Sequence, residues 1–324
     1  TADRTFSVVV SSALFAFSTH TFTNAGQTGR FGPSLATLKS AYSSAAWRNN
    51  TAFFNLEQKP YSGALHSGFQ LWTVPEDGSY RIGAKGASGG GYSQWAWGGS
   101  GAHVAATFSL TKGEKLLIIV GQQGTAPDGG STRRSGGGGG ASYVLQGQST
   151  IVDASRGGPP WYGVGFVSNT TIKIVAGGGG GAQGVGTPHG IAYQPAGAAI
   201  SSQASVITSG GGGSYTGRYG SSGGAGFFAN GGHVTSWRAA QRPYEGSDGS
   251  RDTYGGNLAY GGFGGGGCSA VFDPGGGGGY QGGNVRGYDS NPCSRGGTCR
   301  TNGSSTYFSY NSTQSHGSVT ITQL

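Results

Sequence analysis

The feature that most constrains the fold is the junction at residues 171–182, TIKIVAGGGGGA, where an alternating β-branched run stops in five consecutive glycines. The alternation predicts a β-strand. Glycines cannot stabilise a continuation of that strand, because they have no side chains to pack and their backbone freedom makes them costly to order. Some interaction of the backbone itself must offset that cost.

Similar junctions recur at residues 116–124, LLIIVGQQG, at 136–144, GGGGGASYV, and at 274–280, PGGGGGY. Glycine lets extended threefold helices lie side by side at a spacing that a Cβ would forbid, as at the axis of collagen. Neighbouring segments can then exchange backbone hydrogen bonds, so we predict packed polyglycine II helices. The structural glycines of two blocks are Gly177, Gly178, Gly179, Gly180 and Gly181, and Gly275, Gly276, Gly277, Gly278 and Gly279.

Disorder is the alternative explanation for this composition. The chain has 71 glycines and 11 prolines among 324 residues, and a fraction of about a quarter without a period is typical of low-complexity chains. Strand-like runs with aromatic residues flank the glycine blocks, however, and a disordered chain would lack them. We therefore predict an ordered domain packed through its glycines.

Local patterns predict one helix and several strands. Leu35, Leu38 and Tyr42 are spaced to share one face of a short helix that begins at Pro33 or Ser34. Two pairs of strand-like runs flank short turns, which favours two hairpins. The hairpins are expected at 68–75 with 79–83 and at 103–110 with 115–120. A short strand followed by a glycine turn is expected within 19–31, and single strands at 141–145, 171–175 and 317–324. Together these elements predict an all-β antiparallel sandwich with glycine helices in its long connections.

The chain is expected to divide near residue 18. Residues 3–10, DRTFSVVV, favour either the end of a preceding Ig-like domain or a strand donated to a neighbouring copy, so 1–18 is assigned to that element. A chain that starts at Thr1 and has no methionine is expected to be processed or a fragment. Residues 19–324 form the glycine-rich sandwich domain, with the glycine-helix insert mainly at 177–300.

The charge balance is basic, with a formal net charge of +8. No acidic residue occurs between Asp153 and Glu245, whereas Arg156, Lys173, Arg218, Arg238 and Arg242 lie in that interval. Scattered solvated arginines are the simplest explanation. The same interval would also attract an anionic partner, such as a phosphorylated or acidic glycan.

Membrane and cysteine signals are sparse. There is no apolar run of about 18 residues, so we expect no membrane insertion. Cys293 and Cys299 bracket the short loop CSRGGTC and are a candidate disulfide, which leaves Cys268 as a third cysteine. Glycosylation sequons occur at Asn49, Asn169, Asn302 and Asn311.

Several motifs in their order along the chain resemble one family. They are TFTNAGQTGRFGP at 21–33, LWTVPEDGSYRI at 71–82, GEKLLIIVGQQG at 113–124, IVAGGGGG at 174–181, PGGGGGYQGG at 274–283 and HGSVTI at 316–321. Residues 19–324 resemble the glycine-rich domain of the anaplastic lymphoma kinase and leukocyte tyrosine kinase ectodomains. The module is also similar to glycine-rich domains predicted at the ends of phage tail fibres and in microbial surface proteins.

The resemblance implies a TNF-like, jelly-roll-like antiparallel sandwich with an inserted polyglycine II helix bundle. It implies a non-catalytic extracellular domain that binds a partner, without a cofactor. The sequence contains no kinase and fewer cysteines than the animal receptors. The Ig-like character of DRTFSVVV favours the receptor-binding tip of a phage tail fibre or a microbial adhesin over a receptor ectodomain.

Catalytic and cofactor motifs are weak. The G-x-G-x-x-G spacing within 177–186 is followed by Thr187 and Pro188 rather than by a helix, and no ribose-binding acid follows at the required distance. The six histidines are dispersed, with no pair at metal-ligand spacing. The acidic residues Glu245, Asp248 and Asp252 fail the EF-hand pattern, so we expect a solvated turn there. We therefore predict that the chain is not an enzyme and holds no metal.

Nucleic-acid binding is also a weak interpretation, because only two Arg-Gly-Gly sites occur, at Arg156 and Arg295. Aromatic residues in loop-like context are the stronger signal, since they supply large contact area at small entropic cost. They could instead roof the glycine bundle, which has no side chains to exclude water. The candidate partner-binding residues are Tyr92, Trp95, Trp97, Trp161, Tyr162, Arg218, Trp237, Arg238, Arg242 and Tyr244.

Three functions follow as hypotheses. The first is a recognition module that presents loops to a cell-surface protein or glycan, as function often resides in loops on a rigid scaffold. The second is a filament or homo-oligomer in which residues 3–17 complete a neighbour's sheet. The third is the ligand-binding ectodomain of a receptor.

Overall fold

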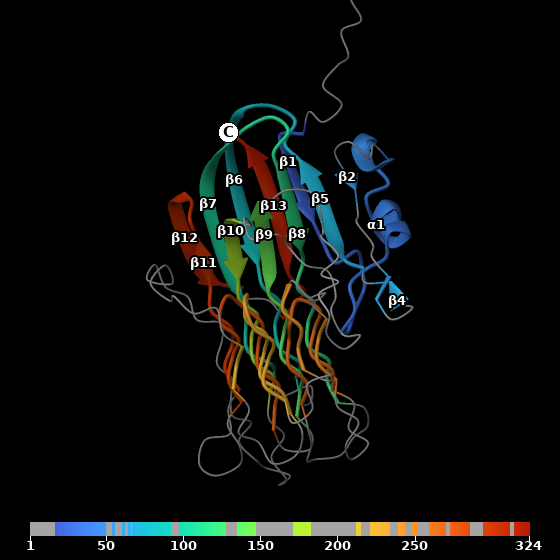
Figure 1. Cartoon of the computed structure of the whole chain (residues 1–324), viewed down its shortest axis with the longest axis vertical. Helices are drawn as coiled ribbons and strands as arrows, with labels where there is room; N and C mark the ends of the chain where they lie inside the picture. The colour runs from blue at the N-terminus through green and yellow to red at the C-terminus, as the bar shows by residue number, and fades with distance from the viewer. Residues whose placement is uncertain are drawn as a thin grey trace, which may run out of the picture.

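The structure is a computed structural model in which two packed β-sheets continue into a bundle of extended glycine segments (Figure 1). It describes residues 17–49, 54–55, 60–61, 64–65, 67–91, 97–127, 135–146, 171–182, 212–214, 221–233, 239–243, 248–251, 259–269, 273–285, 294–311 and 314–324. The strands run along the long axis of the molecule, and the glycine segments follow them below (Figure 1).

The first sheet has five strands in the order β1-β13-β6-β7-β12, and every neighbouring pair is antiparallel. The strands are β1 (Thr19–Phe22), β13 (Ser318–Gln323), β6 (Gly78–Lys85), β7 (Ala102–Leu110) and β12 (Ser304–Tyr310). The last strand, β13, lies between β1 and β6. The prediction that the end of the chain returns to a sheet is therefore confirmed.

The second sheet has six strands in the order β11-β10-β9-β8-β5-β2. They are β11 (Arg300–Thr301), β10 (Thr171–Ala176), β9 (Ser142–Gln146), β8 (Lys115–Ile119), β5 (Phe69–Thr73) and β2 (Phe54–Asn55). A separate short pair joins β3 (Pro60–Tyr61) to β4 (Ala64–Leu65). The two large sheets make a mostly β, sandwich-like fold, so the predicted all-β sandwich is confirmed.

Alternation along the strands builds the core between the sheets. On β6, Tyr80, Ile82 and Ala84 are buried, whereas the residues between them point outward. The second sheet contributes a nearly continuous apolar layer. Its fully buried members include Trp72, Leu116, Ile118, Ile119, Tyr143, Val144, Ile174 and Val175.

The one helix forms where the sequence predicted it. Helix α1 (Leu35–Ala41) buries Leu38, and the Ser34 hydroxyl caps it by accepting the Thr37 N–H at 3.1 Å. A short 3₁₀ turn, η1 (Ala46–Asn49), follows and buries Trp47 against the same part of the core.

Both predicted hairpins are wrong. β5 and β6 lie in different sheets, as do β7 and β8, while β5 pairs with β8 and β6 pairs with β7. Residues 74–77 and 111–114 are therefore arches that cross between the sheets. Alternation and a short turn locate two strands, but they do not decide whether the turn closes a hairpin or changes layer.

The two arches lie side by side and bond to each other. The Val74 N–H donates to the Glu114 carbonyl at 2.8 Å, and the Gly113 N–H donates to the Val74 carbonyl at 2.9 Å. The Lys112 N–H donates to the Asp77 carboxylate at 2.7 Å. These bonds satisfy backbone groups that a pair of hairpins would have used internally.

The glycine block at 177–181 bonds to several other segments. The Gly178 N–H donates to Gly278 and the Gly179 N–H to Ala87, at 2.8 and 2.9 Å. Carbonyl groups of the same block accept N–H bonds from Ala102, Gly297, Gly139 and Gly99. The second block, 275–279, donates N–H bonds to Gly136, Ser222, Arg295, Gly139 and Ala225. Links from each block to more than one neighbour are thus confirmed.

Close approach explains why glycine is required in these blocks. A Cβ built on Gly179 would lie 1.8 Å from the Gly99 carbonyl oxygen, and one on Gly277 would lie 2.2 Å from that of Gly178. Neither block contains a glycine with positive φ. The glycines of both blocks therefore have φ values that other residues can also adopt. A side chain is excluded from these positions by the lack of space and not by the backbone conformation.

We call the set of cross-bonded segments the glycine bundle. Its described segments are 86–91, 97–101, 121–125, 135–140, 177–182, 212–214, 221–225, 230–233, 239–241, 248–250, 259–269, 273–279, 281–285 and 294–298. Besides the expected insert at 177–300, the connections between β6 and β7 and between β8 and β9 also join it. Strands β11 and β12, at the end of that insert, were not predicted.

The start of the described chain packs against its own domain. The Phe17 ring lies 6.4 Å from that of Trp47 and 5.7 Å from that of Trp72. The Ser18 carbonyl accepts the Gln323 N–H at 3.0 Å. Residues 1–16, which carry the predicted Ig-like or donated strand, lie outside the described residues.

Candidate functional site

The loop residues predicted to contact a partner are described only in part. Tyr92, Trp95, Trp161, Tyr162, Arg218, Trp237, Arg238 and Tyr244 lie outside the described residues. Trp97 is described and is 61% exposed. It precedes Gly98, which packs tightly on the Gly89 backbone. Trp97 therefore projects from the glycine bundle instead of roofing it.

Arg242 has a structural role. Its backbone N–H donates to the Asn230 side chain at 2.8 Å, and its guanidinium Nη1 donates to the Phe228 carbonyl at 2.6 Å. Both bonds fasten the turn at 226–230 to the bundle. The side chain of Phe228, whose carbonyl accepts this bond, is 51% exposed.

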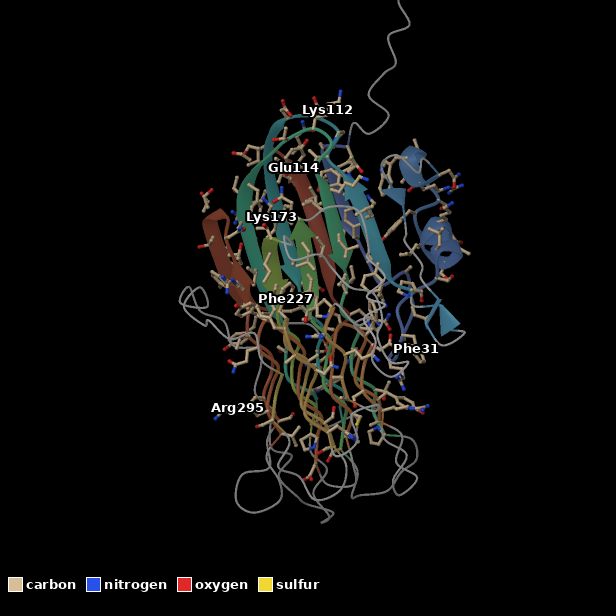
Figure 2. All side chains as sticks on the ribbon, viewed as in Figure 1. Phe31, Lys112, Glu114, Lys173, Phe227 and Arg295 are labelled. Atoms are coloured by element: carbon tan, nitrogen blue, oxygen red, sulfur yellow. The ribbon has the colours of Figure 1, made fainter. Side chains whose placement is uncertain are left out.

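An aromatic group that the sequence analysis missed joins the bundle to the sandwich. Phe227 stacks on Tyr280 with ring centroids 6.4 Å apart and lies at 6.4 Å from Tyr143 of β9. It sits where the strands end and the bundle begins (Figure 2). The Tyr143 hydroxyl donates to the Gly279 carbonyl at 3.2 Å, and burial raises the pKa of Tyr143. The group is a structural joint.

The outer face of the five-stranded sheet carries rows of hydroxyl groups. Thr19 of β1 bonds Thr322 of β13 through their hydroxyls at 3.0 Å, and Thr21 bonds Thr320 at 2.9 Å. These pairs lie directly opposite each other in the strand register. Cross-strand threonine pairs stabilise a sheet and leave each hydroxyl with further bonding capacity.

Three basic side chains lie on the same face. Lys85 of β6 is directly opposite His103 of β7, and Arg81 lies four residues earlier on β6. The Arg81 guanidinium Nη1 donates to the Thr107 hydroxyl at 3.3 Å and to the Ser305 carbonyl on β12. Arg81 therefore reaches across β7 and is held flat on the sheet.

The electrostatics of this face are one-sided. Partial burial lowers the pKa of His103, and the positive charges of Lys85 and Arg81 lower it further. The sequences of β1, β6, β7, β12 and β13 contain no aspartate or glutamate. The Tyr307 ring of β12 is 51% exposed and meets the His103 ring edge-on at 5.5 Å. We call Arg81, Lys85, His103, Tyr307 and the threonine rows the basic sheet face.

Two further histidines of the described chain, His20 and His316, make contacts within the fold. His20 lies among the rings of Phe22, Tyr42 and Trp47 at 4.6, 5.2 and 4.7 Å. Burial lowers its pKa to about 4. The His316 imidazole Nδ1 accepts the Gln123 N–H at 3.0 Å. Within the residues that the structure describes, no three His, Cys, Asp or Glu side chains gather as metal ligands.

Two sequence expectations need correction. Cys299 is a buried free thiol rather than half of the predicted disulfide with Cys293, which lies outside the described residues. Burial raises the pKa of this thiol to about 12. Asp248 is 4% exposed, so it does not lie on a solvated turn. Burial lowers the pKa of Arg30, and the negative charge of Asp248 opposes that shift. Arg30 and Asp248 are distant in the sequence, so the sequence analysis could not predict that they lie near each other.

Comparison with known proteins gives a partial relationship. A segment of 104 residues is 36% identical to the mouse leukocyte tyrosine kinase receptor. The matched segment makes up 32% of this chain and 11% of the receptor. The chain thus matches only a small part of that protein's length. No protein-family model matches the chain. In the described part of the chain, no helix is both long enough and apolar enough to span a bilayer.

Proposed function

We propose that this chain is a non-enzymatic extracellular recognition module, in which a rigid scaffold presents loops to a cell-surface protein or glycan. In this proposal the sandwich is a TNF-like jelly roll and the glycine segments are polyglycine II helices. The loop aromatic and basic residues named above, with Trp97 as the exposed described member, contact the partner.

The observation that carries the proposal is the cross-bonding of the glycine bundle. A single block, 177–181, bonds to segments near residues 87, 99, 139, 275 and 297. Such a bundle fixes the relative positions of the described segments from which its loops extend, without needing side chains to form a core. A scaffold of this kind suits recognition, because loops on a rigid support lose little entropy on binding.

The comparison supports one form of the proposal over the others. The 36% identity over 104 residues is to a receptor tyrosine kinase. It therefore supports a module of the kind found in a receptor ectodomain more than a phage tail-fibre tip or a microbial adhesin. Those two remain predictions from the resemblance of the motifs, and the filament remains a prediction from residues 3–17.

The test is binding of the full chain to panels of recombinant cell-surface ectodomains and of glycans. We expect a saturable partner, and about tenfold weaker binding when Trp95 and Trp97 are both changed to serine. Tyr310→Ser is the matched control, because Tyr310 is a 55% exposed aromatic residue on the edge strand β12 and is not one of the loop residues.

Two results would count against the proposal. One is the absence of any saturable partner across both panels. The other is a partner whose affinity is unchanged by the loop substitutions and by the corresponding changes at Trp161 and Trp237. Conversion of a bound molecule into a product would show an enzyme instead.

A further inference from the structure

The basic sheet face has a regular layout that the strand register defines. One row across the strands holds Ser318, Lys85, His103 and Ser309, and another holds Thr19, Thr322, Arg81, Thr107 and Ser304. Between them runs a row of Thr21, Thr320, Gly83, Ala105 and Tyr307. The two cationic rows are four residues apart along β6, which is about 13 Å.

The middle row has smaller side chains on β6 and β7 than the rows on either side of it. A Cβ added at Gly83 would meet only the His103 ring nitrogen at 3.5 Å and the Ala105 methyl at 3.7 Å. Gly83 and Ala105 therefore form a shallow floor, with a basic row on each side along the strands. Tyr307 and the Thr21–Thr320 pair stand at its two ends across the sheet.

This arrangement presents positive charge that no acidic residue of the five strands offsets. Lys85 and His103 are cross-strand neighbours, so protonation of His103 would place like charges opposite each other, which destabilises a sheet. The five strands supply no acid to offset them. Folding alone gains nothing from this pairing, whereas an anion bound over the floor would interact with both side chains and with Arg81.

We propose that the basic sheet face binds an acidic polysaccharide, with its carboxylate or sulfate groups on the two cationic rows and its sugar hydroxyls on the threonine rows. The Tyr307 ring at the rim offers an apolar surface for the face of a sugar ring. The proposal concerns a surface distinct from the loops, and it does not depend on what the loops recognise.

The geometry favours a polysaccharide over an acidic peptide. Extended peptides bind sheets mainly through backbone hydrogen bonds at an edge. On this face the floor lies over β6 and β7, whose backbone groups already pair with strands on both sides. A peptide would find no backbone partner there.

Single-stranded nucleic acid fits less well for a different reason. Its binding surfaces stack successive bases on several aromatic side chains. Among the residues of the basic sheet face, the adjoining rings of Tyr307 and His103 are the two that could stack on a base. A chain rich in hydroxyls with regularly spaced anions matches the hydroxyl rows and the paired cations better.

The test uses the full chain with dextran sulfate as the probe and unsulfated dextran, polyglutamate and single-stranded DNA as comparisons. Lys85→Gln should weaken dextran sulfate binding about fivefold, and Tyr307→Ser should weaken it about threefold. Lys112→Gln is the matched control. It removes the same charge from the exposed arch at the far end of the sheet and should change binding less than twofold (Figure 2).

A pH series gives a second readout. A bound anion favours the imidazolium form, so dextran sulfate affinity should rise as the pH falls from 7.5 to about 5.5, and His103→Gln should flatten that rise. The charged groups facing His103 are Lys85 and Arg81 of β6, while β12 presents Tyr307 and Ser309.

Three outcomes would overturn the proposal. Equal losses from Lys85→Gln and Lys112→Gln would mean that binding follows net charge alone. Polyglutamate or DNA binding as tight as dextran sulfate, with the same sensitivity to Lys85→Gln, would assign the face to a different class of partner. Retention of dextran sulfate affinity by the Lys85 and Tyr307 variants would remove the site. Loop variants at Trp95 and Trp97 should leave dextran sulfate binding unchanged, which separates this test from that of the proposed function.

Discussion

The sandwich and the glycine bundle are ordered by different interactions. In the sandwich, side chains such as Trp72, Ile82 and Tyr143 are fully buried between two sheets. In the bundle, glycine backbones approach so closely that an added Cβ at most described positions would lie within 3 Å of a carbonyl group. One region is stabilised by apolar burial and the other by backbone hydrogen bonds between close neighbours.

This difference shows why the two regions tolerate change differently. A core side chain can shrink and leave a cavity whose cost is graded by volume. A glycine in the bundle can only grow, and its neighbours are main-chain atoms that cannot rotate away. We therefore expect a glycine substitution in the bundle to cause a large loss of stability or to prevent folding. Truncation of a core side chain in the sandwich should instead reduce stability in proportion to the volume removed.

The largest effect is expected for Gly179→Ala. The added Cβ would lie 1.8 Å from the Gly99 carbonyl oxygen and 2.4 Å from its carbon. We expect a loss above about 4 kcal/mol in the free energy of unfolding, or no folded protein. Urea unfolding followed by tryptophan fluorescence measures it.

The matched control is Gly83→Ala on β6. There the added Cβ would meet only side-chain atoms at 3.5 and 3.7 Å, so the change should stay within about 0.5 kcal/mol. If both variants lost similar stability, the bundle would not be the tightly packed region that the hydrogen bonds indicate.

A smaller, graded effect is expected at Ile82 in the sandwich. Ile82 is fully buried, so Ile82→Val should cost about 1 kcal/mol and Ile82→Ala about 2–5 kcal/mol. The same unfolding experiment measures both. Equal costs for the two variants would mean that this core does not respond to cavity volume, and the contrast with the bundle would be lost.

Much of this fold could be predicted from the sequence because its signals are local. Alternation located β9, β10 and β13, and the spacing of Leu35, Leu38 and Tyr42 located α1. The glycine blocks indicated close backbone packing because no other interaction could order them. The hydrogen bonds of Gly178 and Gly179 confirm that inference.

The layer assignment and the basic sheet face could not be predicted in the same way. The turns at 74–77 and 111–114 have ordinary hairpin composition, and only the pairing of β5 with β8 makes them arches. Lys85 and His103 are 18 positions apart in the sequence and become neighbours only through the register of β6 with β7. Strand β12 was missed because its exposed serines and tyrosines resemble a loop.

A third substitution separates conformation from space as the reason for a glycine. Gly113 in the arch has a φ of +88° and no atom within 4 Å of an added Cβ. Gly113→Ala should therefore cost about 1 kcal/mol through backbone strain alone, and Gly113→Asn less, because asparagine tolerates this conformation better. A cost for alanine as large as that at Gly179 would contradict the distinction.

The last expected effect concerns pH and should act on the sandwich. His20 lies among Phe22, Tyr42 and Trp47, its Nε2 has no hydrogen-bond partner, and burial lowers its pKa from 6.5 to about 4. As the pH falls through 6.5, the unfolded chain binds a proton at His20 that the folded chain does not, so stability falls until about pH 4 and then levels off.

His20→Phe keeps an aromatic ring in the cluster and removes this contribution. His103 and His316, whose pKa values burial also lowers, remain in both proteins, so the difference between the two unfolding curves isolates His20. We expect the urea midpoint of the variant to fall less between pH 7 and 4.5, and the His20 imidazole to titrate near 4 by NMR. Parallel midpoint curves for the two proteins would show that the ring is solvated in the folded state and that acid does not act on this part of the sandwich.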